Sequence, residues 1–130
     1  MELNKELLDS LMKQASESER LRAAYDLRTS SDDGSQRMLN ALLPGTVVPV
    51  HRHPATVETV MIVCGSVTEV FYDDNGKATK RITLDAAQGN YGVQIPVGQW
   101  HTVVVTEPCV ILEIKDGAYT PAAPEDMMNI

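Results

Sequence analysis

The sequence has little positive charge. It contains 11 Lys and Arg residues against 18 Asp and Glu residues among 130, and its formal net charge is -7. Broad attraction to a phosphate backbone or to anionic lipid needs clustered Lys and Arg side chains. The composition therefore predicts neither a nucleic-acid partner nor a membrane partner.

Long apolar runs are also missing. No run reaches the length that spans a bilayer, and the first six residues lack the apolar core of a signal peptide. We therefore expect a cytoplasmic protein. Cysteine is scarce, since the chain has only Cys64 and Cys109, far apart in strand-like apolar segments. In that compartment we expect two reduced, buried thiols rather than a disulfide.

Helical spacing of apolar residues is confined to the start of the chain. It predicts an amphipathic helix over residues 4–16, with Asn4 as its N-cap. From about residue 20, short apolar or alternating runs separated by Gly, Pro, Asn and Asp predict strands and turns. The expected organisation is one all-β domain, with a helical segment over residues 1–20, a sandwich or barrel over residues 21–120 and a tail over residues 121–130.

Nine strands are expected. They cover residues 22–27, 36–43, 46–51, 58–64, 66–72, 79–84, 91–95, 101–106 and 109–115. Asn75-Gly76 predicts a tight hairpin turn, because this pair accepts positive φ angles. The proline-containing tail is expected to be either a loosely attached terminus or an arm on the surface.

The chemically informative residues are three histidines and one glutamate. His51 and His53 are two positions apart, so both side chains of an extended strand project to the same side. Glu58 can return on a neighbouring strand, and a turn at residues 96–98 leads His101 into a later strand. Three neutral imidazoles and one carboxylate form a ligand set for a divalent first-row ion.

We therefore expect His51, His53, Glu58 and His101 to bind one divalent ion, for which Fe, Zn, Ni, Mn and Co are all suitable. The alternative is that the histidines are half-exposed strand residues and that Glu58 is a solvated carboxylate. We favour the metal site because an unpaired glutamate buried beside imidazoles is costly without a cation. All three histidines of the chain also take part in it.

These residues resemble the two motifs of the cupin superfamily. The first motif is matched at every position, by Gly45, His51, His53, Glu58 and Gly65. The second is matched by Pro96, Gly98 and His101, but its leading glycine is one place early, at Gly89, and Val105 replaces a usual Asn. The resemblance implies a cupin fold, which is a double-stranded β-helix or jelly-roll barrel, here with a short N-terminal helix.

From Arg22 to about Pro121 the chain also resembles the WbuC family of cupin-fold metalloproteins. Residues 36–54, 91–96 and 100–103 carry the likeness. Members of that family occur in bacterial surface-polysaccharide metabolism, such as O-antigen or lipopolysaccharide biosynthesis, so the resemblance implies that setting. Small cupins commonly pair, so it also implies a homodimer.

Four polar residues are candidates for binding a ligand beside the ion. Arg37 and Asn40 lie on a strand that borders the cavity in cupins, where a guanidinium would suit a carboxylate or phosphate. Tyr91 and Gln94 precede the second turn and would contact a ligand or a metal-bound water. The members of each pair are three positions apart, so a straight strand directs at most one of them inward. Glu113 breaks an apolar run, and we expect it at a solvated edge rather than in the pocket.

The sequence thus predicts a metal-binding cupin that acts on a sugar or another small polar metabolite. As an enzyme it would use the ion as a Lewis acid or to activate water, in an isomerisation or a hydrolysis. The alternatives are an iron-dependent dioxygenase and a non-catalytic module that binds a small molecule with the help of the metal. Fold and ligands are common to all three, so the sequence does not choose between them.

Overall fold

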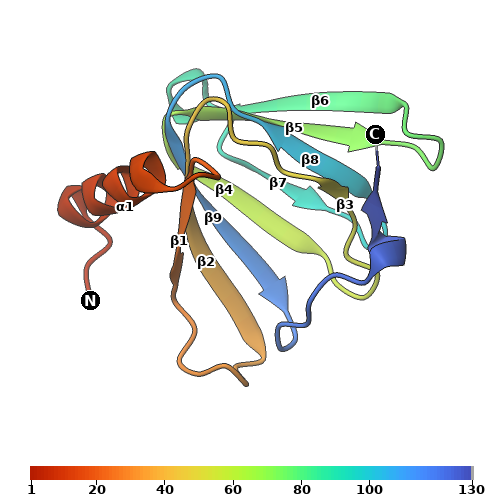
Figure 1. The fold of residues 1–130 in the computed structure, drawn as a ribbon, viewed down its shortest axis with the longest axis horizontal. Helices are drawn as coiled ribbons and strands as arrows, with labels where there is room; N and C mark the ends of the chain where they lie inside the picture. The colour runs from red at the N-terminus through yellow and green to blue at the C-terminus, as the bar shows by residue number, and fades with distance from the viewer. Residues whose placement is uncertain (130) are drawn as a thin grey trace.

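The computed structural model describes residues 1–129 and contains two antiparallel β-sheets of five strands each (Figure 1). The strand order is β1-β2-β9-β4-β7 in one sheet and β10-β3-β8-β5-β6 in the other. The elements in chain order are α1 (Lys5–Glu17), β1 (Arg22–Asp26), β2 (Ser35–Leu42), β3 (Val50–His51), β4 (Glu58–Cys64), β5 (Ser66–Tyr72), β6 (Ala78–Asp85), the 3-10 turn η1 (Ala86–Gln88), β7 (Gly92–Ile95), β8 (Trp100–Val104), β9 (Cys109–Asp116), the 3-10 turn η2 (Pro124–Asp126) and β10 (Met127–Met128).

Helix α1 packs on the outside of the first sheet. The predicted cap is confirmed, because the Asn4 side chain accepts a hydrogen bond from the backbone N–H of Leu7 at 3.1 Å. Leu11 and Ala15 are fully buried, so the apolar stripe is covered within the chain. They share a cluster with residues of β2 and β9, namely Leu39, Ala41 and Val110. No helix within residues 1–129 has the length and apolarity to cross a membrane.

One half of the space between the sheets is an apolar core. Its buried residues are Leu42, Val60, Ile62, Val67, Phe71, Leu84, Ile95, Val105, Cys109 and Ile111. Burial of a large aliphatic or aromatic side chain contributes about 1.5–3 kcal/mol to stability. Because inward positions recur at every second residue, this core also sets which residues further along β2, β4, β5 and β9 face the interior.

The strand expected over residues 46–51 is shorter than predicted, because only Val50 and His51, which form β3, pair with neighbouring strands. The preceding segment bonds to side chains instead, because the carbonyl oxygens of Val47 and Val48 accept from Arg22 Nη1 at 2.8 Å and Thr102 Oγ1 at 2.6 Å. A proline without an N–H then follows. The other eight expected strands are present, and their ends differ from the prediction by no more than two residues.

The C-terminal tail is an arm attached to the second sheet (Figure 1). Met127 of β10 lies opposite His51 of β3 in an antiparallel pair. Just before it, buried Asp126 accepts a hydrogen bond from Arg52 Nε at 2.8 Å. Of the two expectations for the tail, the arm therefore fits residues up to 129, and Ile130 lies outside the described residues. A pairing of two residues leaves no periodic pattern, so β10 was missed.

Gly65 lets two chain segments approach closely at the end of the first cupin-like motif. Its φ is 74°, and a Cβ there would lie 2.3 Å from the carbonyl oxygen of Pro108. Beside it, Cys64 and Cys109 are free thiols, as predicted, but only Cys109 is buried, whereas Cys64 is half-buried. Burial raises the pKa of Cys109 to about 12, so this thiol is protonated at neutral pH and inert as a nucleophile.

Candidate metal centre

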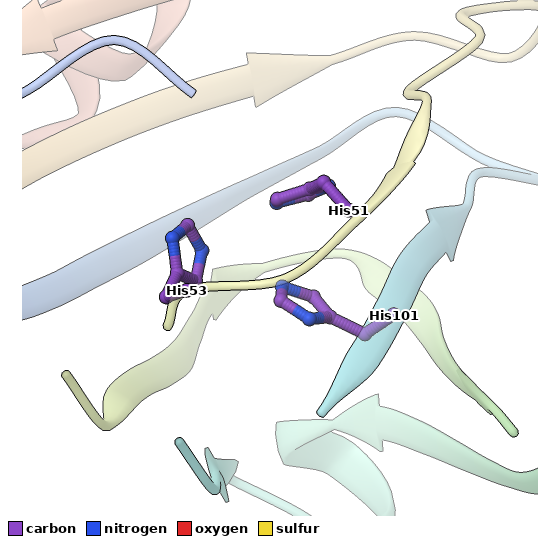
Figure 2. A group of neighbouring side chains, drawn as sticks. All are labelled: His51, His53 and His101. Carbon is purple, nitrogen blue, oxygen red and sulfur yellow. The ribbon is translucent and has the colours of Figure 1, made fainter. Parts of the chain in front are cut away.

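The three histidines converge from two separated segments (Figure 2). His51 on β3 lies directly opposite His101 on β8, and His53 follows two residues after His51. The ring centroid of His51 is 4.4 Å from that of His101 and 5.0 Å from that of His53. One nitrogen atom of each ring lies within 4.8 Å of the other two, which is close enough for a single ion to contact all three.

Backbone carbonyls determine which nitrogen of two rings is free. His51 Nδ1 lies 2.8 Å from the carbonyl oxygen of Pro49, and His101 Nδ1 lies 2.8 Å from that of Gln99. A carbonyl only accepts, so each Nδ1 carries the proton and each neutral ring presents a lone pair at Nε2. Partners of this kind fix the orientation of metal-binding histidines.

Glu58 supplies the carboxylate of the centre. It begins β4, is 3% exposed, and places Oε1 3.3 Å from His101 Nε2 and 3.7 Å from His53 Nε2. Lys115 Nζ lies 3.7 Å from the other oxygen. Burial by itself raises the pKa of Glu58, but the His101 and His53 rings, in the metal-free state in which Nε2 carries a proton, and the Lys115 ammonium together hold it below its usual range, so the carboxylate is ionised.

The unmet bonding capacity of these side chains fits a cation. The Nε2 atoms of His53 and His101 are buried and have no hydrogen-bond partner among residues 1–129. Burial and the neighbouring His101 lower the pKa of His51 to about 4, so its imidazole is neutral at pH 7. Three neutral nitrogen donors facing one carboxylate oxygen suit a divalent ion such as Fe, Zn, Ni, Mn or Co. His51, His53, Glu58 and His101, the predicted ligand set, are thus brought together.

A cavity of about 190 Å³ lies beside this cluster, in the half of the interior that the apolar core leaves open. It is lined by Arg22, Asn40, Leu42, Val48, His51, Glu58, Glu69, His101, Thr102, Val103 and Glu113. The expectation of a solvated edge position for Glu113 was wrong. The residue faces inward because it pairs with Val60 of β4, whose side chain is 1% exposed in the core.

The cavity holds two carboxyl groups besides Glu58. Burial and the charge of Glu58 raise the pKa of Glu113 to about 8, and Asn40 Nδ2 donates a hydrogen bond to its Oε1 at 3.0 Å. Glu69 is 2% exposed, and its pKa is raised well above the ordinary value by burial and by the charges of Glu58 and Glu113. These two acids come from opposite sheets, β9 and β5, and influence each other across the cavity.

Of the four predicted ligand-binding residues, one lines this cavity. Asn40 does, whereas the Arg37 guanidinium is bound at the other end of β2, donating to Asp33 Oδ2 at 3.0 Å and to two carbonyl oxygens. Tyr91 is 59% exposed, and Gln94 lies on the exposed face of β7, where its Nε2 donates to Thr59 Oγ1 at 3.3 Å. The structure thus places Arg37, Tyr91 and Gln94 outside the cavity.

Two charged residues that line the cavity, Glu69 and Arg22, were not singled out from the sequence. A signal for Glu69 was present, because it shares strand parity with Val67 and Phe71, both of which are buried. An acid between two core positions on one face of a strand indicates an inward carboxyl group. Arg22 opens β1 and gave no comparable signal, since an arginine at the start of a strand is normally on the surface.

The chain resembles known proteins in sequence and in fold. A family model described as "Domain of unknown function (DUF6016)" matches residues 3–84. This range includes three of the four clustered side chains, and His101 lies beyond it. No curated protein matches the chain.

Several solved structures share the fold. The capsular polysaccharide assembling protein CapF from Staphylococcus aureus superimposes with a TM-score of 0.66 at 21% identity, over 85% of this chain and 30% of that chain. An oxalate oxidase bound to the substrate analogue glycolate gives 0.63 at 16% identity, over 82% and 56%. The Bacillus subtilis oxalate decarboxylase, whose description names Mn(II) centres, gives 0.61 at 21% identity, over 78% and 27%.

The chain therefore corresponds to only part of each of these proteins, between 27% and 56% of their length. At these identities the likeness concerns the fold. Together with the two antiparallel sheets, it identifies a cupin jelly-roll barrel, so the predicted all-β fold class with a short N-terminal helix is confirmed.

Proposed function

This chain belongs to the family described as "Domain of unknown function (DUF6016)", and we propose that it is a metal-dependent cupin enzyme that acts on a sugar or another small polar metabolite. The proposed ligands of one divalent ion are His51, His53, Glu58 and His101. The observation that carries the proposal is a pair of buried Nε2 atoms, those of His53 and His101, that have no hydrogen-bond partner within residues 1–129 and lie near the Glu58 carboxylate beside a cavity.

The chain's own groups prepare this site for binding. The carbonyl oxygens of Pro49 and Gln99 hold two imidazoles in the tautomer that presents Nε2. Glu58 offers an anionic oxygen, which offsets part of the charge of a divalent ion. When bound, such an ion supplies a Lewis acid that polarises an oxygen atom of the ligand or of water. The adjoining cavity admits a ligand of modest size, held by carboxyl, amide and guanidinium groups.

The metabolic setting is proposed from two resemblances. The sequence is similar to the WbuC family, which occurs in surface-polysaccharide metabolism, and the fold is similar to that of CapF, described as a capsular polysaccharide assembling protein. We propose a role in the metabolism of bacterial surface polysaccharides. The homodimer implied by the first resemblance stays a prediction, and sedimentation of the purified chain at several concentrations measures it.

Reconstitution with single metals tests the proposed activity. Metal-free protein is loaded separately with Mn, Fe(II), Zn, Ni or Co and incubated with sugars, sugar nucleotides and sugar acids, while NMR follows the substrates and an electrode follows oxygen. We expect conversion without oxygen uptake by at least one metal form, and none by His53→Ala. Oxygen uptake by the Fe(II) form alone would instead identify a dioxygenase. Saturable ligand binding without turnover by any metal form would identify a binding module.

A further inference from the structure

Glu69 is buried in the cavity without a hydrogen-bond partner for one of its oxygens. The residue is 2% exposed, and its Oε2 makes no hydrogen bond with any of residues 1–129. Glu69 on β5 lies opposite Val103 on β8. Two residues further along β5, Phe71 lies opposite His101, so Glu69 is next to the histidine cluster along the strand. A buried polar atom without a hydrogen-bond partner destabilises the folded protein. A buried acid aimed into a cavity next to a candidate metal centre therefore indicates a group that binds a ligand.

Glu69 faces two further polar groups across the cavity. Glu113 on β9 and Asn40 on β2 are joined by a hydrogen bond of 3.0 Å, which uses one carboxyl oxygen and one amide hydrogen. The second Glu113 oxygen and the Asn40 carbonyl oxygen keep capacity to accept hydrogen bonds. Acceptors thus approach the cavity from three strands, so a ligand with several hydroxyl groups can bond to all of them at once.

The size and remaining lining of the cavity match one small ring. Its volume of about 190 Å³ is below the range of about 300–1,000 Å³ typical of pockets for drug-sized ligands. Leu42, Val48 and Val103 provide an apolar part of the wall, against which the C–H face of a sugar ring can pack. The mixture of apolar wall and polar groups is therefore suited to a single sugar ring rather than to an oligosaccharide.

The charges of the lining argue against an anionic ligand. An anion would lie against the Glu58 carboxylate and would meet the carboxyl groups of Glu69 and Glu113, which carry no positive charge in either protonation state, while Arg22 is the one lining residue within the described chain that is permanently cationic. Repulsion by Glu58 in a buried site disfavours an anion, and the other two acids offer it no compensating charge. A hydroxyl group can bond to a carboxyl group in either protonation state, so binding of a neutral ligand does not depend on how the acids titrate.

We propose that the cavity binds a neutral, polyhydroxylated ligand of the size of one sugar ring, with Glu69, Glu113 and Asn40 accepting hydrogen bonds from its hydroxyl groups. This inference rests on the proposed function and specifies its substrate class. Glu69 is then a determinant of specificity that lies outside the predicted metal ligands.

Calorimetric binding to the metal-loaded protein tests this inference. The probes are the neutral sugars glucose, galactose, mannose, rhamnose and N-acetylglucosamine, and the anions glucuronate and glucose 1-phosphate. The variants are Glu69→Leu, which removes the acceptor, and Glu69→Gln, which keeps the shape and one acceptor oxygen. Glu107→Gln, at an exposed position, is the matched control. Metal content is measured for every protein.

At least one neutral sugar should saturate the wild-type protein and bind more tightly than the anions. Its Kd should rise roughly tenfold or more in Glu69→Leu and less in Glu69→Gln, and it should stay within about twofold in Glu107→Gln. Tighter binding of either anion, failure of every neutral sugar to bind, or an unchanged Kd in Glu69→Leu would overturn the inference. If the wild-type protein carries metal, these failures leave the proposed function standing, whereas a wild-type protein without metal overturns the proposed function itself.

Discussion

The two halves of the barrel interior are built from the same strands and have opposite chemistry. Val60 on β4 and Ile111 on β9 are each 1% exposed and belong to the apolar core. Two residues away on the same strands, Glu58 on β4 and Glu113 on β9 belong to the polar half. In the polar half, three buried atoms have no hydrogen-bond partner within residues 1–129, namely His53 Nε2, His101 Nε2 and Glu69 Oε2. The apolar half is complete in the folded chain, whereas the polar half is completed by what it binds.

The largest effect is expected from damage to the apolar half. Leu84 is fully buried there, so Leu84→Ala leaves a cavity and should lower the free energy of unfolding by about 2–5 kcal/mol, measured by urea denaturation. Metal content should not change. Val104→Ala, at a position that is 40% exposed, is the control and should change stability by less than about 0.5 kcal/mol. Equal losses in the two variants would contradict the division of the interior.

Removal of the ion should weaken the polar half by a comparable but smaller amount. A ligand at about 100 times its Kd stabilises the folded state by roughly 2.7 kcal/mol, so a chelator should lower the thermal midpoint of the wild-type protein accordingly. His53→Ala, which is expected to hold no ion, should not respond to the chelator. A wild-type melting curve that is unaffected by the chelator would show that the polar half is stable by itself.

A smaller effect concerns the pH dependence of the metal-free protein. Burial raises the pKa of Glu69 well above the ordinary value of 4.5, so the folded state holds this proton more tightly than the unfolded state does. The stability that this proton contributes is present at low pH and is lost as the pH rises through and above about 4.5. Glu69→Gln has no proton to lose. As the pH rises above about 4.5 it should therefore lose less stability than the wild-type protein in thermal denaturation, and parallel curves would refute the prediction.

The smallest effect is expected on the outer surface of the barrel. Gln94 lies on the exposed face of β7 and contacts Thr59 rather than the cavity. Gln94→Ala should change the free energy of unfolding by less than about 0.5 kcal/mol and should leave metal content and sugar binding unaltered. A loss of ligand affinity in this variant would mean that the binding site extends beyond the inner face.

The sequence predicted the strands and the convergence of the ligand set better than it predicted the cavity wall. Alternating apolar residues are a local pattern, and they were sufficient for eight strands. The structure also places the three histidine rings close together and beside the Glu58 carboxylate, whereas ion binding by these four residues stays a prediction. The inward direction of Glu113 depends on its register with Val60 of another strand. Because register is a property of the pairing, the sequence alone favoured a solvated edge for this residue.

The tail shows the same limit in another form. The short strand β10 pairs with β3, and the buried Asp126 before it accepts hydrogen bonds from the backbone and the guanidinium of Arg52. The Arg52 guanidinium also lies 4.4 Å from the Trp100 ring centroid. Nothing in the sequence next to Asp126 or Arg52 indicates that these two residues form a pair. Long-range pairs of this kind form only after the barrel has brought distant segments together.

Elemental analysis of the chain, purified without added metal, tests the central claim that four side chains share one cation. The wild-type protein should carry about one divalent ion per chain, and His53→Ala should carry almost none while remaining folded, because this side chain is 21% exposed and outside the apolar core. Gln94→Ala is the matched control and should keep the ion. Equal metal content in the wild-type protein and His53→Ala, or no metal in the wild-type protein, would contradict the claim.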